Sequence, residues 1–141
     1  LRLYVKPLLI KGVPSIMTDL QEFYVDVTKR QQIQDLLDGW LKNMKSEMVL
    51  DLDEEVEQDP TVMAWLLYFL SQHYTFCKNQ NEKALEIINE AIEHTPTLLE
   101  LYTHKGKIFQ QAGDRCRAAD LFEKARELDQ ADRAINALSA L

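Results

Sequence analysis

The side chains that most often carry out chemistry are scattered along this sequence. Its three histidines are His73, His94 and His104, and its two cysteines, Cys77 and Cys116, lie 39 residues apart. None of the histidines shares a usual metal-binding spacing with another histidine, a cysteine or a pair of acids, and there is no Cys-x-x-Cys pair. We therefore expect no metal site and no catalytic group here. Both thiols are expected to be small apolar fillers in a reduced, intracellular protein.

An acidic run could also hold a cation, because six of the nine residues from 51 to 59 are acidic. A calcium-binding loop would need glycine at its sixth position and a bidentate glutamate at its twelfth. Val56 and Val62 stand at those two positions. The run is therefore interpreted as an exposed, solvated connection.

The remaining signals for enzymatic or nucleic-acid chemistry are weak. The four glycines form none of the phosphate-binding or nucleophile-elbow motifs: Gly12, Gly39, Gly106 and Gly113. The 23 acids outnumber the 16 lysines and arginines and give a net charge of −7, which disfavours nucleic-acid binding. The longest apolar run, residues 62–70, is too short to span a membrane, and no secretory signal heads the chain. A protein partner is the remaining expectation, with no cofactor bound by this chain.

A protein that holds a partner needs a rigid framework, and the sequence contains a repeat that could form one. One pattern of small and large residues occurs twice, 34 residues apart. That period is typical of the tetratricopeptide repeat, a helix–turn–helix unit that must stack on its neighbours to bury its apolar face. The alanines are expected to let helices approach closely, and the larger side chains to fill the space between units. The two sets are Ala84, Ile88, Ala91 and Pro96, then Ala118, Phe122, Ala125 and Gln130.

The second repeat also shows the pattern of its first helix, in Tyr102, Gly106, Phe109 and the turn residue Gly113. Glycine at 106 permits tight packing, and glycine at 113 supplies a left-handed residue after the helix. The first repeat matches less closely. Its turn from residue 75 to 83 has no glycine, so Asn79 or Asn81 is expected to take the positive φ.

These features predict an all-α fold of helical hairpins stacked into a right-handed solenoid, as a fragment of a longer horseshoe. Pro96 should end the first repeat. Within residues 1–50 we expect a divergent helical pair, its second helix starting at Thr28 and running to about Ser46. The predicted segments are 1–50 for that pair, 51–60 for the acidic connection, 61–97 and 98–131 for the two repeats, and 132–141 for the first helix of a truncated third unit.

Candidate partner contacts lie on the first helix of each repeat. Trp65 and Tyr68 would face the inner curve as binding anchors, with core packing as an equally good alternative. The positions that form a carboxylate clamp in some repeat proteins hold Tyr68, Gln72, His104, Ala134 and Leu138, so the basic clamp is absent. The inner positions of the second repeat are mixed and polar, which suits a broad, partly wet protein contact. They are Glu100, Thr103, Lys107 and Gln110.

The sequence resembles the tetratricopeptide auxiliary subunit of the eukaryotic N-terminal acetyltransferase A complex over nearly its whole length. Generic repeats share only sparse alanine and aromatic positions, so longer strings carry this resemblance. They are Lys6-Pro7, Lys11-Gly12-Val13-Pro14-Ser15, Leu70-Ser71-Gln72-His73-Tyr74, Lys83-Ala84-Leu85-Glu86, Ile92-Glu93-His94-Thr95-Pro96-Thr97-Leu98 and Leu128-Asp129-Gln130-Ala131-Asp132-Arg133-Ala134-Ile135-Asn136.

The resemblance implies a non-catalytic, cytoplasmic scaffold that wraps the catalytic acetyltransferase subunit and docks it at the ribosome for co-translational N-terminal acetylation. It also implies that acetyl-coenzyme A binds in the partner, and that an inositol phosphate binds near the subunit junction of the full complex. Arg133 is the one charge that the resemblance carries to that junction, and a plain surface arginine is its alternative. The alternative function is a repeat adaptor that binds a short peptide motif of another protein.

Overall fold

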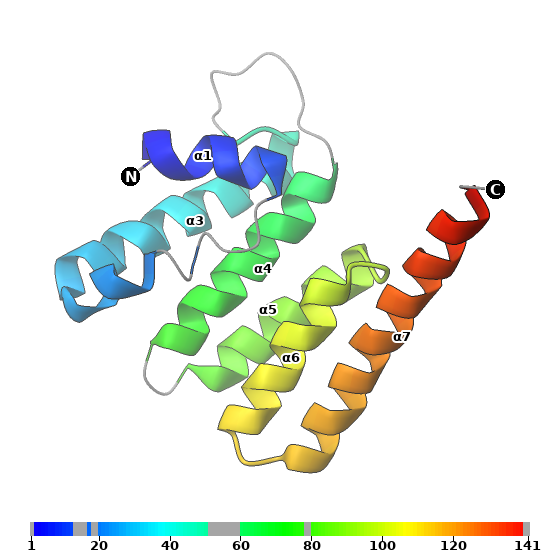
Figure 1. The fold of residues 1–141 in the computed structure, drawn as a ribbon. Helices are drawn as coiled ribbons and strands as arrows, with labels where there is room; N and C mark the ends of the chain where they lie inside the picture. The colour runs from blue at the N-terminus through cyan, green and yellow to red at the C-terminus, as the bar shows by residue number, and fades with distance from the viewer. Residues whose placement is uncertain (1, 13–16, 18–19, 51–59, 78–79, 140–141) are drawn as a thin grey trace.

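The computed structural model describes residues 2–12, 17, 20–50, 60–77 and 80–139, and this part of the chain contains helices and no strand (Figure 1). No helix in it is both long enough and apolar enough to cross a bilayer. In chain order the elements are α1 (Arg2–Lys11), the short 3-10 helix η1 (Gln21–Val25), α3 (Val27–Glu47), α4 (Pro60–Phe76), α5 (Asn81–His94), α6 (Leu99–Gln111) and α7 (Arg115–Ser139).

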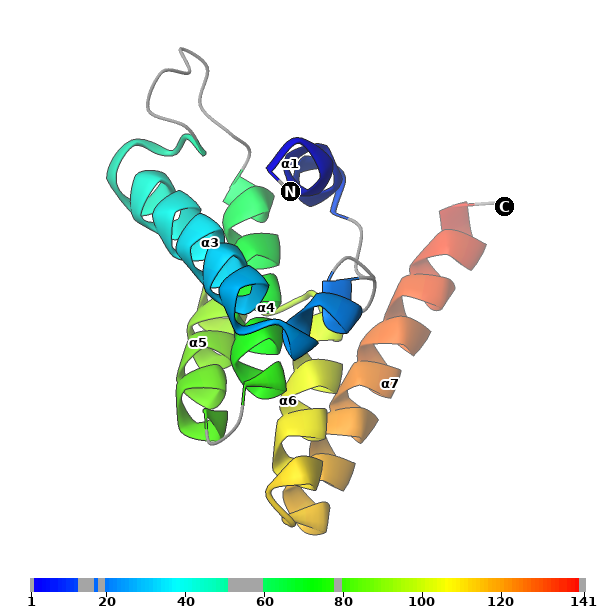
Figure 2. The same cartoon turned by 90° about the vertical axis from the view of Figure 1, so that its left-hand side faces the viewer.

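The helices stack as successive hairpins. α4 packs on α5 and α6 packs on α7, while α5 also contacts α6 and α3 covers another side of α4 (Figures 1 and 2). α1 lies across the beginning of α4. The predicted all-α stack of repeat hairpins is therefore confirmed, and α4 lies in its middle.

The repeated alanines lie where helices meet. Ala84 and Ala91 of α5 are completely buried, and Ala118 and Ala125 of α7 are buried as well. The Ser71 hydroxyl of α4 donates a hydrogen bond of 2.7 Å to the Ala84 carbonyl, an approach that a larger residue in α5 would obstruct. The prediction that small side chains allow close approach between helices is confirmed.

Gly106 of α6 packs closely against Phe122 of α7. A Cβ atom added at Gly106 would come within 2.6 Å of the Phe122 ring. Phe122 therefore fills space inside its own hairpin, whereas the sequence pattern placed it between units. Gly113 has a φ of +89°, as expected for the turn residue that follows α6.

The two repeats end differently because their last positions differ. α5 ends at His94, and Thr95 and Pro96 follow it outside the helix, as predicted. Pro96 accepts a hydrogen bond of 2.7 Å from the Tyr102 hydroxyl through its carbonyl. The equivalent of Pro96 in the second repeat is Gln130, which can continue a helix. α7 accordingly runs unbroken to Ser139, so the prediction that a separate helix begins at Asp132 is wrong.

The amino-terminal third departs further from the sequence prediction. α1 was not expected, since Pro7 lies inside it. α3 begins after Asp26, whose carboxylate accepts hydrogen bonds from the Thr28 and Lys29 amides, so Asp26 and not Thr28 is the cap. Of the first helix expected in the pair, the described residues Met17 and Leu20 are helical and buried, and the 3-10 helix Gln21–Val25 follows them.

One smaller prediction stays open and another is wrong in part. Asn81 is the first residue of α5 and has no positive φ, and the alternative, Asn79, lies outside the described residues, as does the acidic run at 51–59. Cys116 is exposed on α7 and so fills no apolar space, whereas Cys77 is half-buried. Neither outcome affects the repeat packing.

The glycines of α6 and α3 should respond oppositely to substitution by alanine. Gly106→Ala should lower the free energy of unfolding by about 1–2 kcal/mol, because the new methyl group displaces the Phe122 ring. A Cβ added at Gly39 has no atom within 4 Å. Gly39→Ala should therefore raise the free energy of unfolding by about 0.5–1 kcal/mol through helix propensity. Urea unfolding measures both. Equal effects of the two substitutions would contradict the α6–α7 contact described here.

Candidate functional site

The first helices of the two repeats, α4 and α6, lie beside each other and carry most of the predicted partner contacts. Their seam is closed by His104 of α6, whose ring centroid lies 5.7 Å from that of Tyr68. The His104 Nε2 atom is 3.3 Å from the oxygen of the Thr75 hydroxyl, and this hydroxyl donates a hydrogen bond of 2.9 Å to the Ser71 carbonyl. Thr75 is therefore the acceptor in this pair and His104 the donor.

Burial in this seam shifts both titratable side chains toward their neutral forms. Desolvation lowers the pKa of His104 to about 4, opposed in part by a hydrogen bond to the Ser71 backbone, with Lys107 adding a smaller lowering. Desolvation, with the Glu100 carboxylate as a second cause, raises the pKa of Tyr68 to about 12. At neutral pH the seam thus contains no charge from either residue.

The two aromatic anchor candidates lie mainly within the fold. Tyr68 is 8% exposed and belongs to the core. Trp65 is half-buried and packs against the end of α1, where a Cβ added at Gly12 would lie 2.5 Å from its ring nitrogen. This placement matches the core-packing alternative for these residues. A partner contact by either ring stays a prediction.

Polar candidates continue the surface beyond the aromatic ones. The Gln72 Nε2 atom donates a hydrogen bond of 3.3 Å to the Tyr68 hydroxyl, and its buried Oε1 has no partner among the described residues. On α6 a stripe with spacings of three, four and three residues changes along its length from half-buried to exposed. It consists of Glu100, Thr103, Lys107 and Gln110.

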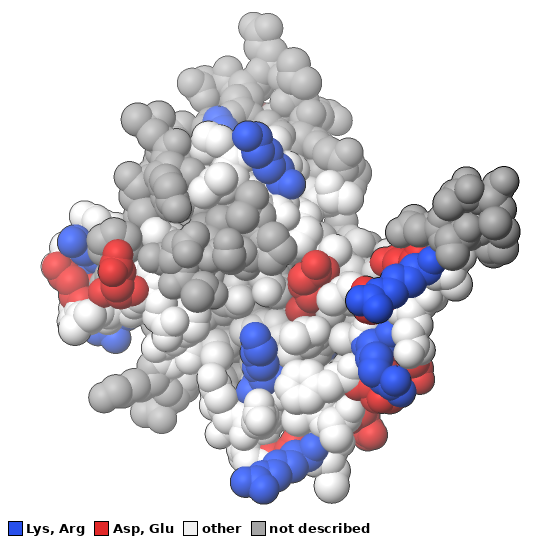
Figure 3. Space-filling view, in the orientation of Figure 1, with Lys and Arg blue, Asp and Glu red and all other residues white. Residues whose placement is uncertain are grey.

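Arg133 lies apart from the other candidates. It is exposed on α7 and pairs with Asp129 at 3.2 Å. The end of α7 that carries it diverges from the rest of the stack in both ribbon views (Figures 1 and 2). In the space-filling view, acidic and basic side chains alternate with neutral surface, with no broad field of one sign (Figure 3). Such a surface suits a mixed protein contact better than a polyanion.

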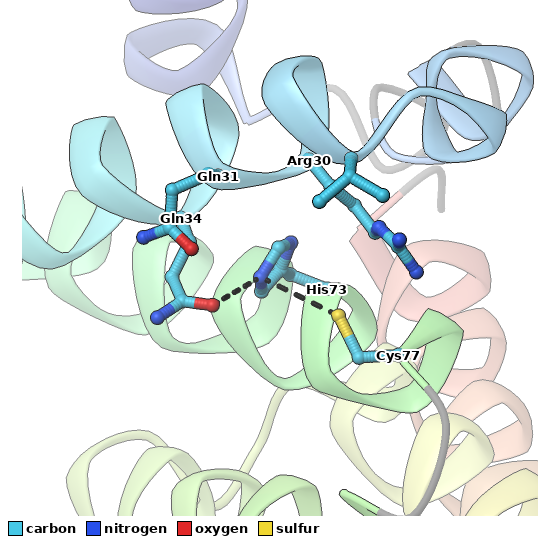
Figure 4. Close-up of a pocket in the computed structure, with 6 residues that line it drawn as sticks. Arg30, Gln31, Gln34, His73 and Cys77 are labelled. Atoms are coloured by element: carbon cyan, nitrogen blue, oxygen red, sulfur yellow. Dashed lines mark hydrogen bonds between the residues drawn. The ribbon is translucent and has the colours of Figure 1, made fainter.

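A second cluster, which the sequence analysis missed, surrounds His73 between α3, α4 and η1 (Figure 4). The Tyr24 hydroxyl lies 2.5 Å from the His73 Nδ1 atom, and the Gln34 Oε1 atom lies 3.2 Å from its Nε2 atom. The Cys77 sulfur is 3.7 Å from the same Nε2. The one local signal was the four-residue spacing of His73 and Cys77. Tyr24 and Gln34 are distant in sequence, and nothing local indicated them.

The His73 cluster is built for hydrogen bonding and not for reaction. Desolvation, with the Arg30 charge as a smaller cause, lowers the pKa of His73 to about 4, so the ring is neutral and accepts from Tyr24 at Nδ1 while donating to Gln34 at Nε2. Desolvation raises the pKa values of Tyr24 and Cys77. A protonated thiol is a poor nucleophile. Within the described ranges, no group of three metal-binding side chains could hold an ion.

Comparison with known sequences gives one consistent result. The profile of the family described as "N-terminal acetyltransferase A, auxiliary subunit" matches residues 1–141. The chain is 41% identical over 133 residues to the N-terminal acetyltransferase A complex auxiliary subunit NAA15 of Arabidopsis thaliana, covering 94% of this chain. It is 38% identical over 138 residues to the NatA auxiliary subunit N-alpha-acetyltransferase 16 of Mus musculus, covering 97% of this chain.

The chain also resembles a solved structure. It matches a chain in the structure of Naa15/Naa10 bound to HypK-THB with a TM-score of 0.75 and 30% identity, over 99% of this chain and 19% of that one. The sequence spans only 15% and 16% of the Arabidopsis and mouse relatives. The likeness therefore concerns one stretch of a much longer helical protein.

Acidification should destabilise the protein through its two buried histidines. The pKa of each is about 6.5 in an unfolded chain and about 4 in the fold, so the unfolded state gains protons first as the pH falls. Each buried histidine makes its full contribution to the free energy of unfolding above about pH 6.5. This contribution, about 1–3 kcal/mol for each histidine, is lost as the pH falls from about 6.5 to 4. Urea midpoints measured at several pH values follow this loss.

Substitutions separate this effect from the titration of the many carboxylates. His73→Gln and His104→Gln should each flatten the pH dependence between pH 6.5 and pH 4, whatever they cost at pH 7. His94→Gln removes an exposed histidine and serves as the matched control, with the wild-type slope retained. An unchanged slope in all three variants would show that the buried histidines do not govern acid stability.

Proposed function

Because the chain belongs to the family of N-terminal acetyltransferase A auxiliary subunits, we propose that it is one stretch of a helical scaffold that holds a separate catalytic acetyltransferase subunit. The observation that carries the proposal is the match to this family along the entire chain. The solved relative of similar fold is described as Naa15 together with Naa10 and HypK, which supports a role in assembly with other subunits.

The physical character of the described residues agrees with a supporting role. The buried His73 and His104 are neutral and hydrogen-bonded, and burial raises the pKa values of Cys77, Tyr24 and Tyr68. The predicted contact residues of α6 form a polar stripe beside packed aromatic rings. Acetyl transfer needs a bound acetyl donor and a positioned base. In this proposal the catalytic partner supplies both, including the acetyl-coenzyme A site.

The remaining parts of the proposal concern the full-length protein. We propose that it acts in the cytoplasm, that other parts of the chain dock the complex at the ribosome, and that an inositol phosphate binds at the subunit junction. Arg133 is the candidate contact in this chain for that phosphate group. Its charge is already paired with Asp129, so a bound phosphate would compete with that carboxylate.

Charge reversal on the inner stripe of α6 should weaken assembly of the full-length protein with its catalytic subunit. Lys107→Glu places an acid on the exposed part of that stripe and should reduce the affinity about three- to tenfold, with a stronger effect at low ionic strength. Titration of the catalytic subunit, followed by interferometry at two salt concentrations, measures it.

Lys124→Glu is the matched control, since Lys124 is also exposed but lies on the second helix of the repeat, away from the stripe. It should leave the affinity unchanged. If neither variant lowers the affinity, α6 is not part of the contact. Purification of the full-length protein without any acetyltransferase subunit, or turnover of peptide substrates by the isolated chain, would overturn the scaffold proposal.

A further inference from the structure

A groove between α3 and α4 lies on the described surface outside the inner stripe. The α3 side consists of Val27 and the residues three, four and seven positions after it. The other side consists of His73 of α4 and Cys77, which directly follows α4. The groove encloses about 180 Å³ and is lined by Val27, Arg30, Gln31, Gln34, His73 and Cys77. Figure 4 shows the two sets facing each other. A stripe with this spacing normally carries apolar side chains against its neighbour, yet here three of its four members are polar.

The floor of this groove is electrically neutral and already hydrogen-bonded. His73 uses both ring nitrogens, one with Tyr24 and one with the Gln34 Oε1 atom. The Gln31 amide nitrogen donates to Asp35 at 2.9 Å. Both ring nitrogens of His73 and the Gln31 amide nitrogen therefore already have partners. The charge of the lining therefore comes from one residue, Arg30.

The Arg30 guanidinium makes no ion pair within the described part of the chain, although acids are abundant. Three arginines of α7 show the usual arrangement, each paired with an acid three or four residues away. The corresponding acid for Arg30 would be Asp26, four residues earlier. Its carboxylate instead caps α3 by accepting from the Thr28 and Lys29 amides. Arg30 is half-buried, and its guanidinium is left without a carboxylate partner among the described residues.

One residue of the groove, and another two positions before it in the chain, are apolar and open to solvent. Val27, a lining residue, is 68% exposed, and Val25 at the end of η1 is 88% exposed. These are the two most exposed large apolar side chains in the described ranges. A free small anion would make no use of them. A protein segment would cover both valines while presenting one carboxylate to the guanidinium.

We propose that the α3–α4 groove binds an acidic segment of a partner protein, with an aspartate or glutamate side chain against Arg30 and a neighbouring apolar side chain over Val25 and Val27. A guanidinium pairs with a carboxylate through two parallel hydrogen bonds, which fixes the orientation of the segment. Arg30 is the one cationic residue of the lining, which is too small a basic footprint for nucleic acid at the same place. The inference is independent of the acetyltransferase role, since the occupant need not be the catalytic subunit.

Photo-crosslinking of the full-length protein in cells identifies the occupant. A benzophenone amino acid placed at Val27 should crosslink to a protein segment that contains an acidic residue next to an apolar one. The same probe at Gln32, an exposed α3 residue that does not line the groove, is the control and should not yield that segment. Crosslinks only to lipid or nucleic acid, to a segment without a carboxylate, or to nothing would overturn the proposal.

A peptide of the crosslinked segment then tests the charge pair by fluorescence anisotropy with the purified full-length protein. Arg30→Gln should weaken binding about tenfold, the value of one charge-assisted contact of about 1.4 kcal/mol. Replacing the acidic residue of the peptide by its amide should weaken binding as much, and the two changes together should cost no more than either alone. Arg117→Gln, on α7, is the matched control and should have no effect.

The result stays decisive if Arg30→Gln impairs folding, because Arg30→Lys keeps the charge and should retain most of the affinity. The circular dichroism melting curve of each variant monitors folding. Additive losses from the protein and peptide changes, or equal binding of the acidic and amide peptides, would show that Arg30 does not recognise a carboxylate. Millimolar acetate that displaces the peptide completely would assign the site to free anions and overturn the partner proposal.

Discussion

The constraint on which the rest of the structure depends is that α4 is apolar on nearly every side. A helix of this kind has no face to give to water, so it must be covered by several neighbours at once. α3, α5, α6 and α1 supply that cover, and the largest part of the core lies around α4. A single helical hairpin cannot do this. Stacking of hairpins is therefore a requirement of the sequence and not merely a preferred arrangement.

Close stacking in turn restricts which residues can stand at the seams, and this is why so much of the fold was predictable. Ala84 and Ala118 recur because a larger side chain would separate two helices, and Gly106 is where a ring from α7 lies on α6. Such restrictions act locally and leave a period in the sequence. Helix ends were predictable where one residue decides them, as at Pro96. Where Gln130 replaces that proline, the period alone suggested an end that α7 does not have.

The features that were not predictable depend on residues far apart in the chain. Tyr24 and Gln34 meet His73 across 49 and 39 residues, and no periodicity links them. The same holds for the groove of Arg30, because the lack of an ion pair for Arg30 among the described residues is a property of the fold and not of the local sequence. Asp26 illustrates the difficulty at short range. Its spacing allowed an ion pair with Arg30, and the geometry of the helix start used the carboxylate as a cap instead.

The buried histidines suggest how an otherwise repetitive stack obtains a single register. Apolar side chains such as those of α4 pack acceptably in several neighbouring arrangements, since dispersion and burial are not directional. His73 and His104 are different, because each needs a hydrogen-bond partner at a fixed position on another element. A shift of one helical turn would leave the buried ring without that partner. Their neutral forms make these contacts without the cost of a buried charge. In the proposed scaffold role the stack would hold partners at fixed distances, and directional polar contacts inside its seams serve that requirement better than apolar packing alone.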